Sequence, residues 1–273
     1  MKKVISANQK LSINFKELIE YKDLFLILAY RDYRVRYAQT LLGFTWAFFQ
    51  PIATLLVFFV VFGRAIQVDT GNVPYPIFAL CGMSCWTYFA FLMSQSGNSI
   101  ILAQNMIKKI YFPRLIIPLS KAVVGLIDYI IVLFLMILLM TYYAFTPSPN
   151  VVFAPVFVFF TIISALAIGI WLSALTVRYR DFQHILPFMV QFGIYVSPVA
   201  FSSQLIADRL PPWLGALYYF NPMAGVIEGF RWSVLGGSAP HHFAYISFSM
   251  VFILLLTGLV YFRRMERIMA DIV

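Results

Sequence analysis

Two carboxylates placed among apolar residues are the first candidates for chemistry in this chain. Asp128 lies within the apolar stretch Ile116–Ala144, where an ionisable side chain is costly unless it serves a site or is paired. Lys121 precedes it by seven residues, about two helical turns along the same face. Asp128 is therefore either a functional group or a structural one that is paired or hydrated near the inner end, and the sequence leaves both interpretations open.

Glu228 is the second carboxylate. Arg231 follows it by three residues, so the two side chains can pair on one face of a short helix, roughly Met223–Val234. Asn221 and Pro222 are a typical helix start, and two glycines after the helix are a typical stop. Pairing would lower the cost of placing these charges in the headgroup region of a membrane.

A second short apolar helix, roughly Trp213–Phe220, precedes the helix of Glu228 and begins after two consecutive prolines. Neither helix has the length needed to cross a bilayer. Residues 211–237 are therefore predicted to form a re-entrant or interfacial helical hairpin before the last apolar stretch.

No familiar nucleotide, metal or hydrolase motif accompanies these carboxylates. The Gly-x-x-x-x-Gly-Lys-Ser/Thr loop that cradles ATP phosphates is missing, as are His-Glu-x-x-His and Gly-x-Ser-x-Gly. Cys81 and Cys85 share a helix face without further metal ligands, so we interpret them as packing residues. We expect no cofactor and no metal in this chain, and we expect a transport subunit rather than an enzyme.

Six apolar stretches must position these residues. Hydrophobic residues make up 62% of the chain and charged residues 11%, where a soluble domain has roughly 25% charged residues. Each stretch approaches or exceeds the ~20 residues needed to cross ~30 Å of hydrocarbon, where only helices satisfy their own backbone. We expect an all-α integral membrane protein with six transmembrane helices, about 41–63, 77–97, 116–144, 151–177, 184–201 and 243–262.

The basic residues lie almost entirely in one alternating set of connections. Eight lysines and arginines precede residue 40, four lie around the second connection, two in the fourth and three in the tail. Arg64, Arg209 and Arg231 lie in the other set. The positive-inside rule then places both termini in the cytoplasm. The net charge of +9 is expected to face anionic membrane lipids, not nucleic acid.

Two amphipathic segments are expected at the cytoplasmic surface. Residues 1–40 are a cytoplasmic segment before a single transmembrane domain, 41–273, and apolar side chains within 12–37 recur at helical spacing. Residues 98–113 form the second amphipathic segment, which is too short to span; polar residues at its start are expected to cap a helix, and a proline ends it. The first segment is a lipid anchor or a docking surface, and its headgroup-facing cations are Arg31, Arg34 and Arg36.

Three stretches carry a resemblance to a known family. They are Arg31–Pro51 (RDYRVRYAQTLLGFTWAFFQP), Asn105–Arg114 (NMIKKIYFPR) and Tyr219–Arg231 (YFNPMAGVIEGFR). Together with the order and spacing of the apolar stretches, they resemble the permease subunit of type-2 ABC exporters, in the branch that handles polysaccharide, O-antigen, capsule or teichoic acid. The resemblance covers nearly the whole chain.

This resemblance implies a channel formed by two copies of the chain, with two separate cytoplasmic ATPase subunits that bind ATP and Mg. The cargo would be a lipid-linked polysaccharide that leaves across the bacterial cytoplasmic (inner) membrane. Residues 98–113 would be the coupling helix and 211–237 the outer gate helices. The gate residues would be Asn221, Pro222, Glu228 and Arg231. The residues coupled to the ATPase would be Gln104, Asn105, Met106, Ile107, Lys108, Lys109, Tyr111, Phe112, Pro113 and Arg114.

Aromatic side chains are the candidates for the transport path. A glycan presents C–H faces on which rings can stack without tight binding to any one sugar, although most aromatics in a membrane protein belong to the core or the interfacial belt. An ion-coupled carrier or an intramembrane enzyme that uses Asp128 is the alternative function. The candidate path residues are Phe44, Trp46, Phe48, Tyr195 and Phe201.

Overall fold

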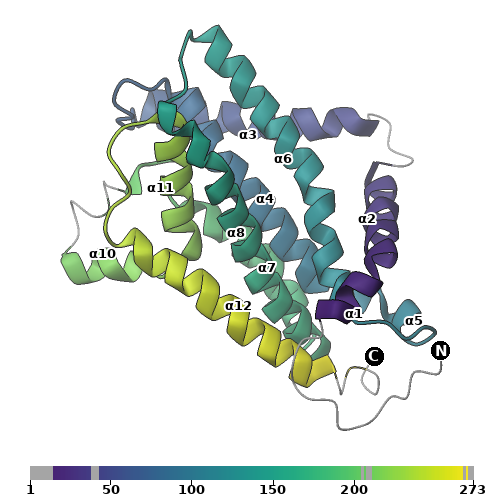
Figure 1. The fold of residues 1–273 in the computed structure, drawn as a ribbon. Helices are drawn as coiled ribbons and strands as arrows, with labels where there is room; N and C mark the ends of the chain where they lie inside the picture. The colour runs from purple at the N-terminus through teal and green to yellow at the C-terminus, as the bar shows by residue number, and fades with distance from the viewer. Residues whose placement is uncertain (1–14, 38–42, 204–205, 207–210, 267–268, 270–273) are drawn as a thin grey trace.

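Helices account for every regular element that the structure describes. The structure is a computed structural model, and it describes residues 15–37, 43–203, 206, 211–266 and 269 (Figure 1). In chain order the elements are α1 (Phe15–Glu20), α2 (Lys22–Tyr37), η1 (Gly43–Thr45), α3 (Trp46–Phe58), η2 (Phe59–Ala65), α4 (Tyr75–Leu102), α5 (Gln104–Ile107), α6 (Ile116–Tyr142), η3 (Pro149–Phe153), α7 (Ala154–Arg178), α8 (Phe182–Val196), α10 (Pro212–Tyr218), α11 (Pro222–Leu235) and α12 (Ala244–Glu266). The predicted all-α class is confirmed for these residues.

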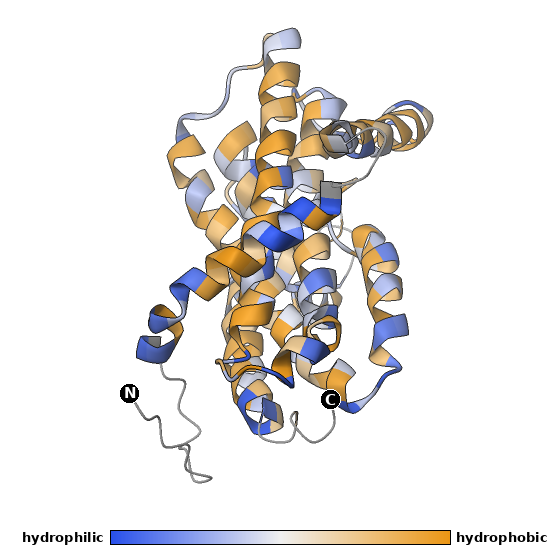
Figure 2. Cartoon of the chain, turned by 90° about the vertical axis from the view of Figure 1, so that its right-hand side faces the viewer, coloured by the Kyte–Doolittle hydropathy of each residue, from blue (hydrophilic) through white to orange (hydrophobic). Residues whose placement is uncertain are grey.

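Five helical stretches among the described residues are long and apolar enough to cross a membrane. They match the first four predicted spans and the last one. Figure 2 shows hydrophobic residues, in orange, along much of the length of the helices. The five stretches are Gly43–Ala65, Tyr75–Leu102, Ile116–Tyr142, Pro149–Arg178 and Ala244–Glu266.

The fifth predicted span, 184–201, differs from the prediction. Its helix α8 has 15 residues and ends at Val196, so it is only about 22 Å long. Ser197 is extended, with φ −87° and ψ 151°, because a residue before proline avoids the helical region. Pro198 therefore ends the helix early, and the six-span count is not confirmed.

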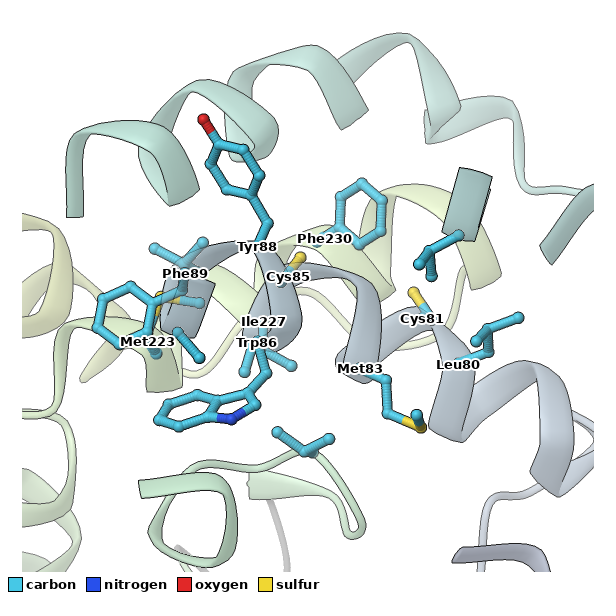
Figure 3. Packing of buried hydrophobic residues seen from close by; sticks show 14 of the residues in the cluster. Leu80, Cys81, Met83, Cys85, Trp86, Tyr88, Phe89, Met223, Ile227 and Phe230 are labelled. Atoms are coloured by element: carbon cyan, nitrogen blue, oxygen red, sulfur yellow. The ribbon is translucent and has the colours of Figure 1, made fainter. Parts of the chain in front are cut away.

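Helix α4 lies at the centre of the bundle and α3 at its edge. In the most apolar part of α4, 83% of the residues are buried. In the most apolar part of Gly43–Ala65, which contains α3, only 17% are buried. Helix α4 packs on α6, α7 and α11, and Figure 3 shows its side chains interleaved with Met223, Ile227 and Phe230 of α11. Figure 1 shows α3 crossing the bundle at a steep angle to these helices. One face of α3 thus has few partners within the chain.

Small residues let α4 and α7 approach each other closely. A Cβ added to Gly169 of α7 would lie 2.6 Å from the Cβ of Ser96 on α4. Thr176 of α7 also donates a hydrogen bond to the carbonyl of Gly97, at 2.8 Å. Small interface residues and hydroxyl bonds are the usual means of helix association in membranes, where the hydrophobic effect between helices is weak.

A bulky residue at this crossing should destabilise the bundle. Gly169→Leu forces apart α4 and α7, and overpacking of this kind costs ~2 kcal/mol or more. Val156→Leu, at an exposed position of the same helix, is the matched control. Thermal unfolding of the purified protein in detergent should show a lowered midpoint for Gly169→Leu alone. Equal midpoints for the two variants would contradict the close packing.

Candidate functional site

Four helices enclose an open cavity of about 780 Å³, here called the polar groove. Its walls come from α3, α4, α6 and α8, with Arg36 of α2 at one end. Amide and hydroxyl side chains line it: Gln50, Thr54, Thr87, Ser94, Gln95 and Gln191. Aromatic rings alternate with them: Trp86, Tyr88, Phe91, Tyr129 and Tyr195. Such a lining offers both hydrogen bonds and flat apolar faces.

Contacts behind the groove hold its aromatic rings in place. Tyr88 of α4 donates a hydrogen bond to the carbonyl of Ala122 at 3.1 Å, and its ring meets the ring of Tyr129 edge to face, with centroids 5.4 Å apart. Both tyrosines are only 3% exposed, so they form a rigid part of the wall without a free face for stacking. The ring of Tyr195, which is 60% exposed, offers a face to a passing ligand.

Two ion pairs join α2 to α6 at the Arg36 end of the groove. Arg36 meets Asp128 at 2.5 Å and lies over the ring of Phe91 at 4.3 Å, while Asp32 pairs with Lys121. Asp32 and Arg36 lie four residues apart on α2, and their partners lie seven residues apart on α6. Both spacings place the two side chains on one face of their helix. Asp128 is thus paired, in agreement with the structural interpretation, but its partner is Arg36 and not Lys121.

The aromatic candidates from the sequence occupy different places. Tyr195 lines the polar groove, whereas α3 contributes Ala47 and Gln50 to the lining, not its predicted aromatics. Phe44 packs edge to face on Phe48, at 5.8 Å between centroids, and Trp46 likewise on Phe49. Phe201 is half-buried against the core. The rings of α4 that line the groove were missed, although neighbouring Thr87, Ser94 and Gln95 were a usable signal of a polar face.

The predicted short helices before the last span are present as α10 and α11. The Asn221 side chain accepts a hydrogen bond from the Met223 amide at 3.0 Å, and Pro222 occupies the first turn, so α11 begins as the sequence indicated. Gly236, with φ +80°, ends it. Most residues of α11 are buried within the chain, against α4, α7 and α12. It is therefore a core element, although the re-entrant path through a membrane is not confirmed.

Arg231 and Glu228 are not paired with each other, contrary to the prediction. The Arg231 guanidinium donates hydrogen bonds to the carbonyls of Pro198 (2.5 Å), Val199 (2.5 Å) and Phe201 (2.9 Å). These carbonyls follow α8, where the chain is no longer helical and buried C=O groups need a donor. We call this set of contacts the carbonyl clamp. The three-residue spacing would allow an ion pair, but the guanidinium binds these three carbonyls and not the carboxylate.

The carbonyl clamp depends on space made by α4. The guanidinium lies 3.7 Å from the ring centre of Phe78, and a Cβ added to Gly82 would come within 2.5 Å of the guanidinium nitrogen. Arg231 is only 7% exposed. A planar fork with several fixed donors meets three carbonyls in a way that a lysine ammonium does not.

Glu228 binds the other side of the hairpin. Its carboxylate accepts hydrogen bonds from the Tyr219 hydroxyl at 2.7 Å and from the backbone amide of His241 at 2.9 Å. Burial, and then the adjacent carboxylate, raise the pKa of the Tyr219 phenol well above its usual range, so the phenol remains a donor. Glu228 thereby ties the end of α10 to the segment that precedes α12.

The segment 98–113 is not one helix. Helix α4 continues to Leu102, because the polar residues expected to cap a new helix bond back to their own turn: Asn98 to the Ser94 carbonyl and Ser99 to that of Ser96. Only Gln104–Ile107 form the next helix, α5. Residues 107–112 and 114 then line a hollow of about 230 Å³.

Within this segment the apolar residues point two ways. Met106 and Ile107 pack partly against the cluster at this end of the bundle, and Phe112 is buried in it. Ile110 and Tyr111 are 60% and 48% exposed. Gln104 is half-buried, Pro113 is buried and Arg114 is half-buried. Among the predicted ATPase-coupling residues, those exposed for a partner are Asn105, Lys108, Lys109, Ile110 and Tyr111.

The amphipathic segment before the first span forms two helices, α1 and α2, which Tyr21 separates. Residues 12–14 of the predicted segment lie outside the described residues. Arg31 pairs with Asp32 at 2.8 Å, and Arg34 lies 5.8 Å from the ring centre of Tyr30. Both arginines are exposed, whereas Arg36 faces the groove.

The family of the chain follows from comparison with known proteins. Residues 23–235 match the family described as ABC-2 type transporter. The chain belongs to this family. The match begins within α2 and ends at the last residue of α11, so it includes the polar groove, α10 and α11. It also includes residues 104–114, which were predicted to contact an ATPase and are here called the coupling segment. With its apolar helices, this ABC-2 type chain is a multi-pass membrane protein.

Several relatives cover most of this ABC-2 type chain. An O-antigen export system permease protein RfbA of Klebsiella pneumoniae is 25% identical over 96% of the chain and 100% of the relative. A protein of the same name from Myxococcus xanthus is 28% identical over 79% of the chain and 82% of the relative. The polysialic acid transport protein KpsM of Escherichia coli is 22% identical over 76% and 79%.

Replacing the guanidinium should weaken the hairpin of this ABC-2 type chain. Arg231→Lys keeps the charge but leaves at least one of three buried carbonyls without a donor, at a cost of ~1–3 kcal/mol. Arg64→Lys, at an exposed arginine over the Phe59 ring, is the matched control. Proteolysis of the purified protein at the α8–α10 connection should accelerate for Arg231→Lys only. An unchanged rate would show that the carbonyl clamp is dispensable.

Proposed function

We propose that this chain is the permease subunit of an exporter that moves a lipid-linked polysaccharide out across the bacterial cytoplasmic membrane. Separate ATPase subunits, which hold ATP and Mg, would supply the energy. Membership in the ABC-2 family supports the transport role, and the names of the relatives, which refer to O-antigen export and polysialic acid transport, support the substrate class. The termini would face the cytoplasm, as the distribution of basic residues indicates.

The polar groove is the observation that carries the proposal. Its amides and hydroxyls can exchange hydrogen bonds with sugar hydroxyls, and an exposed ring such as that of Tyr195 can stack on the C–H face of a sugar. The charges at its end, Arg36 and Asp128, are paired with each other, so no strong field favours a small ion. A hydroxyl-rich polymer can slide past such a lining because no single contact is strong.

A second copy of the chain would complete the path. The groove is open, and α3, which lines one of its walls, has few partners in the chain. Helix α8 presents large apolar side chains outward, among them Phe188 and Phe192 at 59% and 50% exposed. Two copies related by a two-fold axis would turn two open grooves into one enclosed channel.

The pairing of Asp128 bears on the alternative function. An ion-coupled carrier or an intramembrane enzyme needs a carboxylate that gains and loses a proton or an ion. Asp128 is bound to Arg36, and the parallel pair of Asp32 with Lys121 marks both contacts as the means by which α2 docks on α6. This arrangement favours the exporter.

Removing polar lining should reduce export. Gln95→Leu and Gln191→Leu each delete hydrogen-bonding groups from the groove, and we expect roughly fivefold less surface polysaccharide for each. Gln183→Leu, on α8 but outside the groove lining, is the matched control. The measurement is surface glycan, and lipid-linked glycan retained inside, in a strain that lacks its own copy of the chain.

Wild-type surface glycan in both groove variants would reject the groove as the path. Failure of the wild-type chain to restore any surface glycan, although expressed with its ATPase, would reject polysaccharide export itself. Accumulation of lipid-linked glycan inside the deletion strain, and its release when the wild-type chain returns, is the supporting result.

The ATPase contact should depend on exposed apolar residues of the coupling segment. Ile110→Asp or Tyr111→Asp places a charge where a helix or loop would enter an ATPase cleft, and should abolish co-purification of the ATPase or uncouple its hydrolysis from export. Lys108→Ala, at a rim position, should be mild. Cross-linking of single cysteines at 105 and 108–111 to the ATPase measures the contact directly. Absence of cross-links in an active complex would assign the segment to lipid.

A further inference from the structure

The inner end of α12 is tied to the coupling segment through Glu266. The Glu266 carboxylate accepts a hydrogen bond from the Arg114 backbone amide at 3.1 Å, and its other oxygen pairs with Arg263 at 2.7 Å. Arg114 in turn donates from its guanidinium to the Glu266 backbone carbonyl at 2.6 Å. Phe112 lies in the same buried cluster as Phe262 of α12. The residues that follow the proposed ATPase contact are thus bound to α12 by charge-assisted bonds and by apolar packing.

The outer end of α12 is tied to the hairpin through Ser247. This side chain is fully buried, and its hydroxyl oxygen accepts from the Gly225 amide at 3.1 Å. Its proton is shared between the carbonyls of Tyr219 (2.8 Å) and Asn221 (2.9 Å). Gly225 lies in the first turn of α11, where backbone amides have no partner within the helix. Ser247 therefore caps α11 from a neighbouring helix.

The helix between these two ends is well supported. Trp171 of α7 donates its indole N–H to the Thr257 hydroxyl at 3.1 Å, and its ring stacks on Tyr261 with centroids 4.7 Å apart. Figure 1 shows α12 running from beside α10 to the end of the bundle where α1 and α5 lie. A continuous 23-residue helix held in this way moves as one body.

We propose that α12 is a strut that transmits movement of the coupling segment to the outer hairpin, with Glu266 and Ser247 as its attachment points. The inference rests on the proposed function, since it takes the coupling segment as the ATPase contact. Helix α4 is covalently continuous with the coupling segment, whereas α12 reaches it through bonds that a single substitution can remove. Glu266 and Ser247 are positioning residues, because neither lines the polar groove.

The strut is tested in the complex of the chain with its ATPase, in lipid nanodiscs. An environment-sensitive fluorophore is attached at Trp213→Cys on α10, which is 66% exposed, while Cys81 and Cys85 are fully buried and escape labelling. Glu266→Ala and Ser247→Ala remove the two attachments one at a time. Glu20→Ala, an exposed carboxylate of α1, and Ser249→Ala, whose hydroxyl donates to the Tyr245 carbonyl of its own helix, are the matched controls.

Each attachment variant should keep ATP hydrolysis and assembly but lose most of the nucleotide-dependent signal at position 213. Export per ATP hydrolysed should fall roughly fivefold in each, and the controls should match the wild type. A merely structural role would lower the unfolding temperature without changing this ratio. If Glu266→Ala does not assemble, Glu266→Gln and Ser247→Ala decide the question.

The strut is overturned by a wild-type signal and wild-type export per ATP in Ser247→Ala or in an assembled Glu266 variant. It is also overturned by a wild-type complex that exports without any signal change at 213. Failure of the wild-type chain to assemble with an ATPase is a different result, and it rejects the proposed function from which the strut follows.

Discussion

Where a buried chain stops being helical, its backbone groups need new hydrogen-bond partners. One such point, at the end of α8, determines how several helices of this structure are held together. At Ser197 and Pro198 the chain turns out of α8, and the carbonyls of the next residues lie inside the apolar bundle. Arg231 supplies their donors from α11. This single contact fixes the end of α8, hence one wall of the polar groove, to the hairpin. It also explains why a cation is kept in a core helix, since its planar fork satisfies several carbonyls at once.

Two carboxylates also find partners outside their own helices. Buried Glu228 accepts from a phenol and a backbone amide, and half-buried Asp128 accepts from Arg36, so each carboxylate links its helix to another part of the chain. An unpaired charge would be costly in a low-dielectric interior. A paired charge fixes the relative position of two helices more precisely than apolar packing does, because hydrogen bonds are directional. Apart from Arg36 and Asp128 at one end, the polar groove is lined by neutral groups. The charges position the helices, and the neutral groups line the polar groove.

The sequence predicted helix ends well where the signal lies within one turn of the helix. Pro222 and Asn221 at the start of α11 and the glycines at its end act within one turn, and the structure has the helix where they indicated. Predictions of which groups a side chain would bond to were wrong in two places. Three-residue spacing suggested that Glu228 and Arg231 pair, and polar residues near 98 suggested a new helix. The first ignored carbonyls freed elsewhere in the chain, and the second ignored that asparagine and serine can bond to their own preceding turn.

By itself the sequence determined that this chain is helical and membrane-embedded, because hydrophobic length and backbone satisfaction are properties of each segment alone. The sequence also lacks the Gly-x-x-x-x-Gly-Lys-Ser/Thr motif, whose absence can be read directly because the motif is contiguous. Only the tertiary structure decided which aromatics share the polar groove, which cation Asp128 binds, and how Glu266 and Ser247 attach α12 at its two ends. These contacts join residues that are tens of positions or more apart, and their geometry depends on how helices cross. Helix crossing is set by small residues and shape complementarity, which periodicity along one segment does not encode.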